Sequence, residues 1–180
     1  PIEKSIIIIL MLSLWVLHYF YRTILFPMKL RTTGKKIPII IVISAFVFNL
    51  CNGFFVGYEI GYLSQQFNFG INTIIGAVIF LSGMYINRSS DNKLISLRKE
   101  NKEYQIPHGG MFRYISCPNH FGEIIEWFGF AIIVFNLGAL SFALWTAFNL
   151  IPRAVNHHNW YKKSFKEYPD KRKAVIPYIF

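Results

Sequence analysis

Long, almost uninterrupted apolar stretches constrain the fold of this chain more than any other feature. Three of them cover residues 6–26, 37–58 and 69–86, and a further block covers residues 124–151. A transmembrane helix needs about 20 apolar residues to cross the hydrocarbon core of a bilayer. Blocks of this length and uniformity are atypical of soluble helices. The sequence therefore predicts an all-α, multi-pass transmembrane helical bundle.

The last apolar block is interpreted as two spans. A single helix over residues 124–151 would measure about 42 Å, which exceeds the thickness of the bilayer core. The sequence Asn-Leu-Gly at residues 136–138 is typical of a turn. We therefore expect a helical hairpin, in which the fourth span begins near Pro118 and the fifth continues toward Trp160.

The distribution of charge favours five spans with a cytoplasmic C-terminus. The chain carries 19 Lys and Arg residues against 9 Asp and Glu residues, a net charge of +10. With five spans, every basic residue except Lys4 falls on the same side of the membrane. Basic residues accumulate on the cytoplasmic side of membrane proteins. The expected location is therefore a bacterial inner membrane or the endoplasmic reticulum, as an integral multi-pass protein.

Residues 1–180 are expected to form a single membrane domain. Because the chain begins at Pro1 and not at Met, we expect it to be a fragment or a processed product. The histidines lack metal-ligand spacing, so no metal is expected. A soluble nucleic-acid binder would explain the charge but not the apolar blocks. Membrane lipid is thus an expected partner, whereas neither a nucleic acid nor an obligate protein partner is.

Polar side chains recur at helical spacing near the cytoplasmic ends of three predicted spans. Residues three, four and seven positions apart share one face of a helix. The three stripes are Asn87, Asp91 and Arg98; Asn119, Glu123 and Glu126; and Arg153, His157 and Tyr161. Each stripe alone is typical of a solvated helix end with salt bridges. Three stripes at one depth favour a polar cavity that opens to the cytoplasm.

Tyr19 lies within the first span, beside His18 and one turn before Arg22. A tyrosine near the end of a span is commonly an anchor at the membrane interface. In an active site, a phenol instead donates a hydrogen bond or proton to a carbonyl oxygen that gains negative charge. A nearby cation favours that proton transfer because it stabilises the phenolate. Both interpretations of Tyr19 stay open at this point.

Several separated motifs resemble the steroid 5α-reductase family. Residues 106–129, from Ile-Pro-His-Gly-Gly to Glu-Trp-Phe-Gly, look like the long signature of that family. The sequence Leu-His-Tyr-Phe-Tyr-Arg-Thr at residues 17–23 is similar to its early-helix motif. Asn52-Gly53, residues 83–87, Asp91 and the tail from His157 to Phe180 also follow the family order. The resemblance covers nearly the whole chain, and it implies that the chain is the C-terminal catalytic domain of such an enzyme, with the upstream helices absent.

The resemblance implies an NADPH-dependent oxidoreductase that reduces the C4–C5 double bond of 3-oxo-Δ4 steroids. Tyr19 matches the tyrosine that polarises the 3-keto oxygen, and the glutamate that partners it falls on an upstream helix. The positions that match cofactor contacts are Asn87, Asp91, Arg98, Tyr104, Asn119, Glu123, His157 and Tyr161. Weaker candidates for contacts with phosphate are Arg22, Arg31 and Lys35. The expected substrate is a steroid or another lipid enone.

Other functions on a similar architecture stay open. Related enzymes reduce trans-2-enoyl-CoA thioesters or polyprenols, and small membrane methyltransferases use S-adenosylmethionine. A basic scaffold or lipid-binding protein is the non-enzymatic alternative. Gln105 departs from the arginine common at that position of the family. Phe48, Phe142 and Trp145 are interpreted either as the lining of an apolar steroid slot or as ordinary packing.

Overall fold

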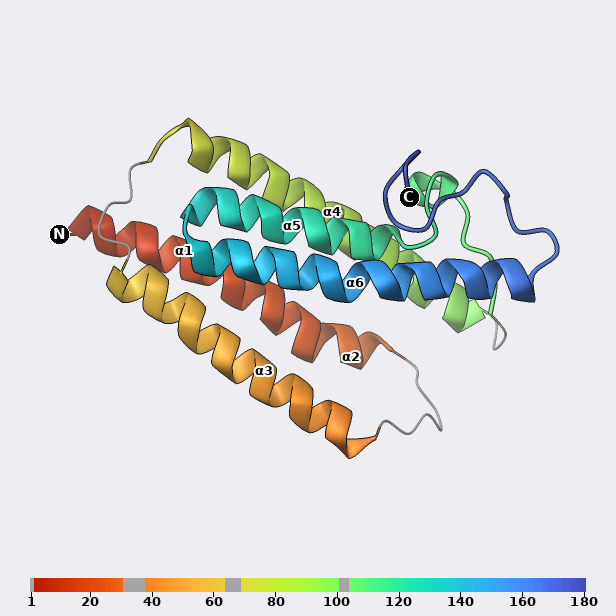
Figure 1. Ribbon diagram of the computed structural model, residues 1–180, viewed down its shortest axis with the longest axis horizontal. Coiled ribbons are helices and arrows are strands. Elements are labelled where there is room, and N and C mark those ends of the chain that lie inside the picture. The colour runs from red at the N-terminus through yellow and green to blue at the C-terminus, as the bar shows by residue number, and fades with distance from the viewer. Residues whose placement is uncertain (1, 31–37, 64–68, 101–103) are drawn as a thin grey trace.

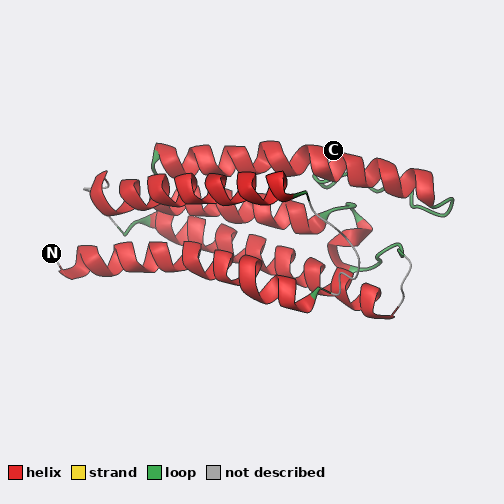
Figure 2. Ribbon diagram, turned by 90° about the horizontal axis from the view of Figure 1, so that it is seen from below, coloured by secondary structure: helices red, strands yellow, loops and turns green. Residues whose placement is uncertain are grey.

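A computed structural model of the protein describes residues 2–30, 38–63, 69–100 and 104–180. Helices make up most of these ranges, with loops at the ends of the bundle (Figures 1 and 2). Within them no β-strand is formed, and one isolated bridge joins Ile115 to Lys173. The predicted all-α fold is therefore confirmed for the described residues.

Residues 2–63 contain two long helical stretches, and residues 71–164 contain three helices. The elements are α1 (Ile2–Phe20), a π-helical segment (Tyr21–Leu25), α2 (Phe26–Lys29), α3 (Ile39–Tyr58), a second π-helical segment (Glu59–Leu63), α4 (Ile71–Glu100), a 3₁₀ turn (Gly110–Arg113), α5 (Pro118–Val134) and α6 (Leu137–Ser164). The helix α4 continues well beyond the apolar block at residues 69–86, because the polar residues that follow pack against α5.

The hairpin predicted in the last apolar block is confirmed, and its turn has a clear local cause. Pro118 begins α5, where the missing N–H of proline costs no helical hydrogen bond. Phe135 ends α5 in the left-handed conformation, with a φ of 51°. The side chain of Asn136 then accepts a hydrogen bond from the backbone N–H of Ala139, at 2.8 Å, and caps α6.

Glycines set the close approach of α4 and α5. Gly76 and Gly83 on α4 face Gly129 and Gly122 on α5, and a Cβ atom at any of the four would overlap the backbone of the other helix. The two antiparallel helices therefore pack at backbone contact, as small residues allow. Beside this contact, Phe80 and Trp127 are almost fully buried in the core.

The remaining elements pack around this central pair. Phe142 and Ala143 of α6 complete the core against Trp127, and Met11 of α1 joins it from the other side. The C-terminal tail lies beside the loop before α5, at the end of the bundle away from the N-terminus (Figure 1). Backbone hydrogen bonds join the tail to this loop, including one from the N–H of Ser116 to the carbonyl of Lys173 at 2.8 Å.

Three helical stretches are long and apolar enough to cross a membrane: Ile8–Lys29, Ile39–Tyr62 and Ile71–Arg98. The second exposes large apolar side chains along its length, such as Phe46 and Phe54. This pattern is expected of a surface that faces lipid rather than water. The count of five spans and the cytoplasmic position of the C-terminus stay predictions.

Candidate functional site

An arginine from the π-helical segment that follows α1 joins the polar stripes of α4 and α5. The guanidinium of Arg22 donates to the carboxylate of Asp91 at 2.8 Å and lies 3.3 Å from a carboxylate oxygen of Glu123. Asp91 is almost fully buried, so its charge needs such a partner. The carboxamide of Asn119 also donates to Asp91, at 3.2 Å. One cation thus holds two carboxylates from two different helices.

The same network extends along the contact between α4 and α5. The carboxamide of Asn87 donates to the backbone carbonyl of Asn119 at 2.9 Å and to Glu123 at 3.5 Å. Asn87 is buried one helical turn from Gly83, where the two backbones touch. The glycine contact therefore places these two asparagines within hydrogen-bond reach, although 32 residues separate them in sequence.

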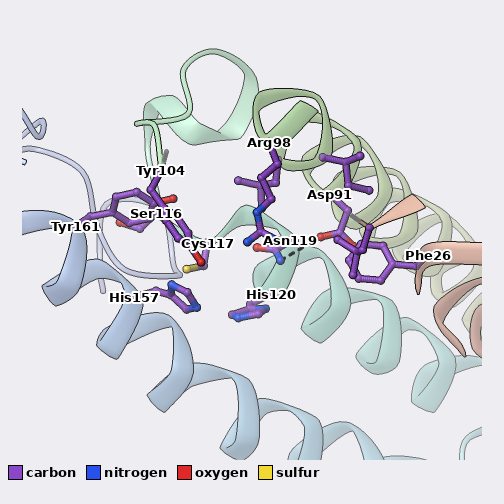
Figure 3. Close-up of a pocket in the computed structure, with 13 residues that line it drawn as sticks. Phe26, Asp91, Arg98, Tyr104, Ser116, Cys117, Asn119, His120, His157 and Tyr161 are labelled. Carbon is purple, nitrogen blue, oxygen red and sulfur yellow. Dashed lines mark hydrogen bonds between the residues drawn. The ribbon is translucent and has the colours of Figure 1, made fainter. Parts of the chain in front are cut away.

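A pocket of about 130 Å³ lies next to this network (Figure 3). Its wall combines cationic, carboxylate, amide, imidazole and phenol groups from α4, α5, α6 and the intervening loop. The lining residues are Phe26, Leu30, Asp91, Leu94, Ile95, Arg98, Tyr104, Ser116, Cys117, Asn119, His120, His157 and Tyr161. In Figure 3, Asp91 and Phe26 lie at one end, Tyr104 and Tyr161 lie at the other, and Arg98 points in between them.

Most residues that match the cofactor positions of the family therefore surround one pocket. These are Asp91, Arg98, Tyr104, Asn119, His157 and Tyr161. Asn87 and Glu123 do not line it but hold the network behind it. Arg31 and Lys35 lie outside the described residues. Arg22 does not line the pocket but binds Asp91, which does.

Besides Asn87 and Glu123, two further members of the predicted stripes do not line this pocket. Glu126 is fully buried, one turn deeper in the bundle, and its carboxylate accepts from Nδ1 of His18 at 2.8 Å. Arg153 is exposed on α6. Helical spacing predicts which residues share a face of one helix, but it does not predict how neighbouring helices pack. His18 of α1 contacts α5 at the level of Glu126, so Glu126 binds His18 and does not join the polar cluster.

Sequence reasoning missed His120, Ser116, Cys117 and Phe26. Nδ1 of His120 is buried with no hydrogen-bond partner in the part of the chain that the structure describes. A buried, unpaired polar atom on a pocket wall marks a contact point for a ligand or for water. The one signal for His120 in the sequence was its position directly after Asn119 in the long signature motif.

A serine of the pocket wall, Ser116, links the C-terminal tail to α6. Oγ of Ser116 accepts hydrogen bonds from Nδ1 of His158 and the hydroxyl of Tyr168, both at 2.6 Å, and donates to the carbonyl of Lys173 at 3.0 Å. The ring of Tyr161 stacks on Tyr168 with centroids 5.2 Å apart. Burial raises the pKa of Tyr161 to about 12, so its hydroxyl is a neutral hydrogen-bond donor at pH 7.

Tyr19 lies beside the network, outside the pocket wall. Its ring packs against Trp15 and Trp127, with centroid distances of 4.2 and 5.9 Å. The candidate steroid slot is not formed by its three residues together. Phe142 is buried in the core, whereas Trp145 is half exposed and stacks on Phe48.

Comparison with known proteins adds independent information. The family model of 3-oxo-5-alpha-steroid 4-dehydrogenase matches residues 35–180. Steroid 5-alpha-reductase DET2 of Arabidopsis thaliana is 43% identical over 183 residues, which cover 96% of this chain and 70% of that protein. 3-oxo-5-alpha-steroid 4-dehydrogenase 2 of Homo sapiens is 41% identical over 174 residues, which cover 94% of this chain and 68% of that protein. 3-oxo-5-alpha-steroid 4-dehydrogenase 1 of Rattus norvegicus is 38% identical over 176 residues, with 94% and 66% coverage.

Proposed function

This chain belongs to the 3-oxo-5-alpha-steroid 4-dehydrogenase family, and from that premise we propose its reaction, cofactor and setting. Membership makes it an oxidoreductase that acts on a CH–CH group, which sets aside the methyltransferase and scaffold alternatives. We propose that it reduces the C4–C5 double bond of a 3-oxo-Δ4 steroid with NADPH while it is embedded in a membrane.

The observation that carries the cofactor assignment is the shared pocket of the motif residues from α4, α5 and α6. NADPH, when bound, supplies the hydride. The chemistry of the pocket wall supports the assignment of such an anionic nucleotide. The guanidinium of Arg98 suits a phosphate, because its donors match phosphate oxygens in bidentate geometry. Asn119, His120 and His157 add groups that hydrogen-bond to hydroxyl or amide groups.

Tyr19 is proposed to polarise the 3-keto oxygen. Reduction of an enone builds negative charge on the ketone oxygen, and a positioned donor lowers the energy of that state. The phenol of Tyr19 lies among aromatic rings, where water is scarce and a hydrogen bond is stronger than in water. Arg22 lies about one turn further along the chain, in the π-helical segment after α1; it adds positive charge nearby and is itself held by Asp91.

The membrane supplies the substrate in this proposal. A steroid is almost wholly apolar, so it partitions into lipid and reaches the bundle from the side. The three long apolar stretches and the exposed apolar face of α3 support a location within the bilayer. The polar pocket lies where α2 and the ends of α4 and α6 meet, which suits the entry of a charged nucleotide from water.

A turnover assay in lipid vesicles tests the proposal. NADPH consumption is measured with a 3-oxo-Δ4 steroid, a long trans-2-enoyl-CoA and a polyprenol, and the products are identified by mass spectrometry. We expect turnover with the steroid and a product two hydrogen atoms heavier. Turnover with only the thioester or the polyprenol would assign the site to another lipid alkene. No saturable NADPH binding would remove the cofactor assignment.

A further inference from the structure

A buried tyrosine near the end of the first helical stretch lies against two positive charges. Tyr21 begins the π-helical segment after α1 and is 9% exposed. Nζ of Lys29, the last residue of α2, lies 5.0 Å from the centre of the Tyr21 ring, and the guanidinium carbon of Arg88, on α4, lies 4.5 Å from it. We call these three residues the Tyr21 cluster. None of them lines the pocket described above.

Two features of the Tyr21 cluster are typical of an anion site. Among the described residues, neither Lys29 nor Arg88 forms an ion pair with a carboxylate, so their charges are not neutralised. The hydroxyl of Tyr21 is buried and has no hydrogen-bond partner within the part of the chain that the structure describes. A buried donor without an acceptor is costly, and an anion beside the two cations supplies that acceptor.

The Tyr21 cluster lies at the boundary between apolar and polar sequence. The apolar block at residues 6–26 ends just before Lys29, and the block at residues 69–86 ends just before Arg88. Helices that cross a membrane place such boundaries at the level of the lipid headgroups. Long basic side chains at this level reach the phosphates while their stems stay on apolar surface. The two cations are therefore placed where phospholipid phosphates lie.

An exposed apolar stripe on α4 leads to Arg88. Leu81, Tyr85 and Arg88 are four and three positions apart, so they share one face of the helix. Ile74 and Val78 continue this face toward the other end of α4, and the four residues before Arg88 on this face are all exposed. A column of exposed apolar side chains that ends in a cation matches an acyl chain that ends in a phosphate.

We propose that the Tyr21 cluster binds the phosphate of an anionic glycerophospholipid, with an acyl chain along the stripe on α4. The guanidinium of Arg88 matches phosphate oxygens in bidentate geometry, Lys29 adds a second charge, and the hydroxyl of Tyr21 donates a hydrogen bond. Two cations favour a lipid with net negative charge over a zwitterionic one. The inference needs the membrane location but neither the proposed reaction nor NADPH.

Lipid binding to the detergent-solubilised protein tests the two cations. Native mass spectrometry gives the dissociation constants of phosphatidylglycerol and phosphatidylcholine with the same acyl chains. We expect the wild-type protein to prefer phosphatidylglycerol. Arg88→Gln and Lys29→Gln should each lose about fivefold in affinity for it, and the double variant more than either. Arg153→Gln removes an exposed arginine of α6 and is the control for net charge.

Tyr21→Phe tests the hydroxyl and keeps the ring that both cations contact. The variant should lose about tenfold in affinity for phosphatidylglycerol, the size expected for one hydrogen bond to a charged group. Without lipid it should unfold at the same temperature as the wild type or higher, because it no longer buries an unpaired hydroxyl. A variant that is less stable without lipid and binds phosphatidylglycerol normally would contradict the role of the hydroxyl.

The source of the phosphate is tested by competition with soluble anions. Inorganic phosphate and glycerol 3-phosphate should displace phosphatidylglycerol only at far higher concentrations than the lipid, because they lack acyl chains. Displacement at equal concentrations would assign the Tyr21 cluster to a soluble anion and overturn the lipid site.

Three further results would overturn the proposal. Equal affinity of the wild-type protein for the two lipids would remove its selectivity. A loss in Arg153→Gln as large as in Arg88→Gln would show a general effect of basic charge. A loss of NADPH affinity in the double variant as large as its loss of phosphatidylglycerol affinity would make the Tyr21 cluster part of the proposed cofactor pocket. Failure of the turnover assay would leave the lipid site standing, since lipid binding is measured without substrate.

Discussion

Nδ1 of His18 on α1 lies 2.8 Å from a carboxylate oxygen of Glu126 on α5, inside the bundle. Arg22 follows about one turn later, in the π-helical segment that continues α1, and binds Asp91 of α4 at 2.8 Å. Because residues four positions apart share one helix face, the two contacts fix the rotation of α1 against both neighbouring helices. Tyr19, between them, is thereby held against Trp15 and Trp127.

The first prediction concerns Glu126. Glu126→Ala leaves the ring N–H of His18 buried without an acceptor, which should lower the free energy of unfolding by about 1–3 kcal/mol. Glu126→Gln keeps a carbonyl acceptor and should lose less. Thermal unfolding in detergent should rank the wild type as the most stable, Glu126→Gln as intermediate and Glu126→Ala as the least stable. An alanine variant as stable as the wild type would show that the pair does not hold α1 in place.

The second prediction concerns Tyr19. Tyr19→Phe should reduce kcat for a 3-oxo-Δ4 steroid by about 100- to 1,000-fold, because it removes one donor to the developing oxyanion. The affinity for NADPH should stay the same, since Tyr19 lies outside the pocket wall. Tyr85→Phe removes an exposed hydroxyl from α4 and serves as the control. Undiminished turnover in Tyr19→Phe would end its catalytic assignment.

The third prediction concerns Arg98. Arg98→Ala should weaken NADPH binding by about 10- to 100-fold, the size expected for lost hydrogen bonds to a charged group. The loss should be larger at low ionic strength, where salt screens less of the attraction. Isothermal titration at two salt concentrations measures both effects. Arg153→Ala removes an exposed arginine of α6 that does not line the pocket, so it should bind NADPH as the wild type does.

The fourth prediction concerns the glycine contact. Gly83→Ala places a Cβ atom against the backbone of α5 at Gly122 and Glu126, so the helices must separate. We expect a loss of about 1–3 kcal/mol in the free energy of unfolding and weaker NADPH binding, because Asn87 moves away from Asn119. Gly57→Ala on α3 meets no atom within 4 Å and should not destabilise the protein. Equal unfolding temperatures for both variants would contradict this role of Gly83.

The fifth prediction concerns Cys117. Burial raises the pKa of its thiol to about 12, so the thiol is almost fully protonated near neutral pH. Only a thiolate reacts rapidly with an alkylating reagent, and at pH 8 the thiolate fraction is about 10⁻⁴. Iodoacetamide at pH 8 should therefore leave Cys117 unmodified in the folded protein and modify it after denaturation, as peptide mass spectrometry would show. Rapid modification of the folded protein would mean that the pocket wall opens at Cys117.

Local signals in the sequence were sufficient to predict the elements of this fold. The apolar blocks predicted α1, α3 and α4, and the turn residues at 136–138 predicted the hairpin of α5 and α6. Polar residues at helical spacing identified Asp91, Asn119 and His157, which line one pocket. These features depend on neighbours in sequence, so periodicity and turn chemistry reveal them.

Contacts between distant residues depend on how the helices rotate and how closely they approach, and only the tertiary structure decided them. Glu126 shares the spacing of Asn119 and Glu123, yet it binds His18 because α1 crosses α5 at that level. His120 and Ser116 line the pocket because the glycine contact and the tail bring α4, α6 and the loop together. Polar residues at helical spacing show which face of a helix they occupy, but they do not show which other helix packs against that face. The physical reason is that this partner is chosen by the packing of the whole bundle.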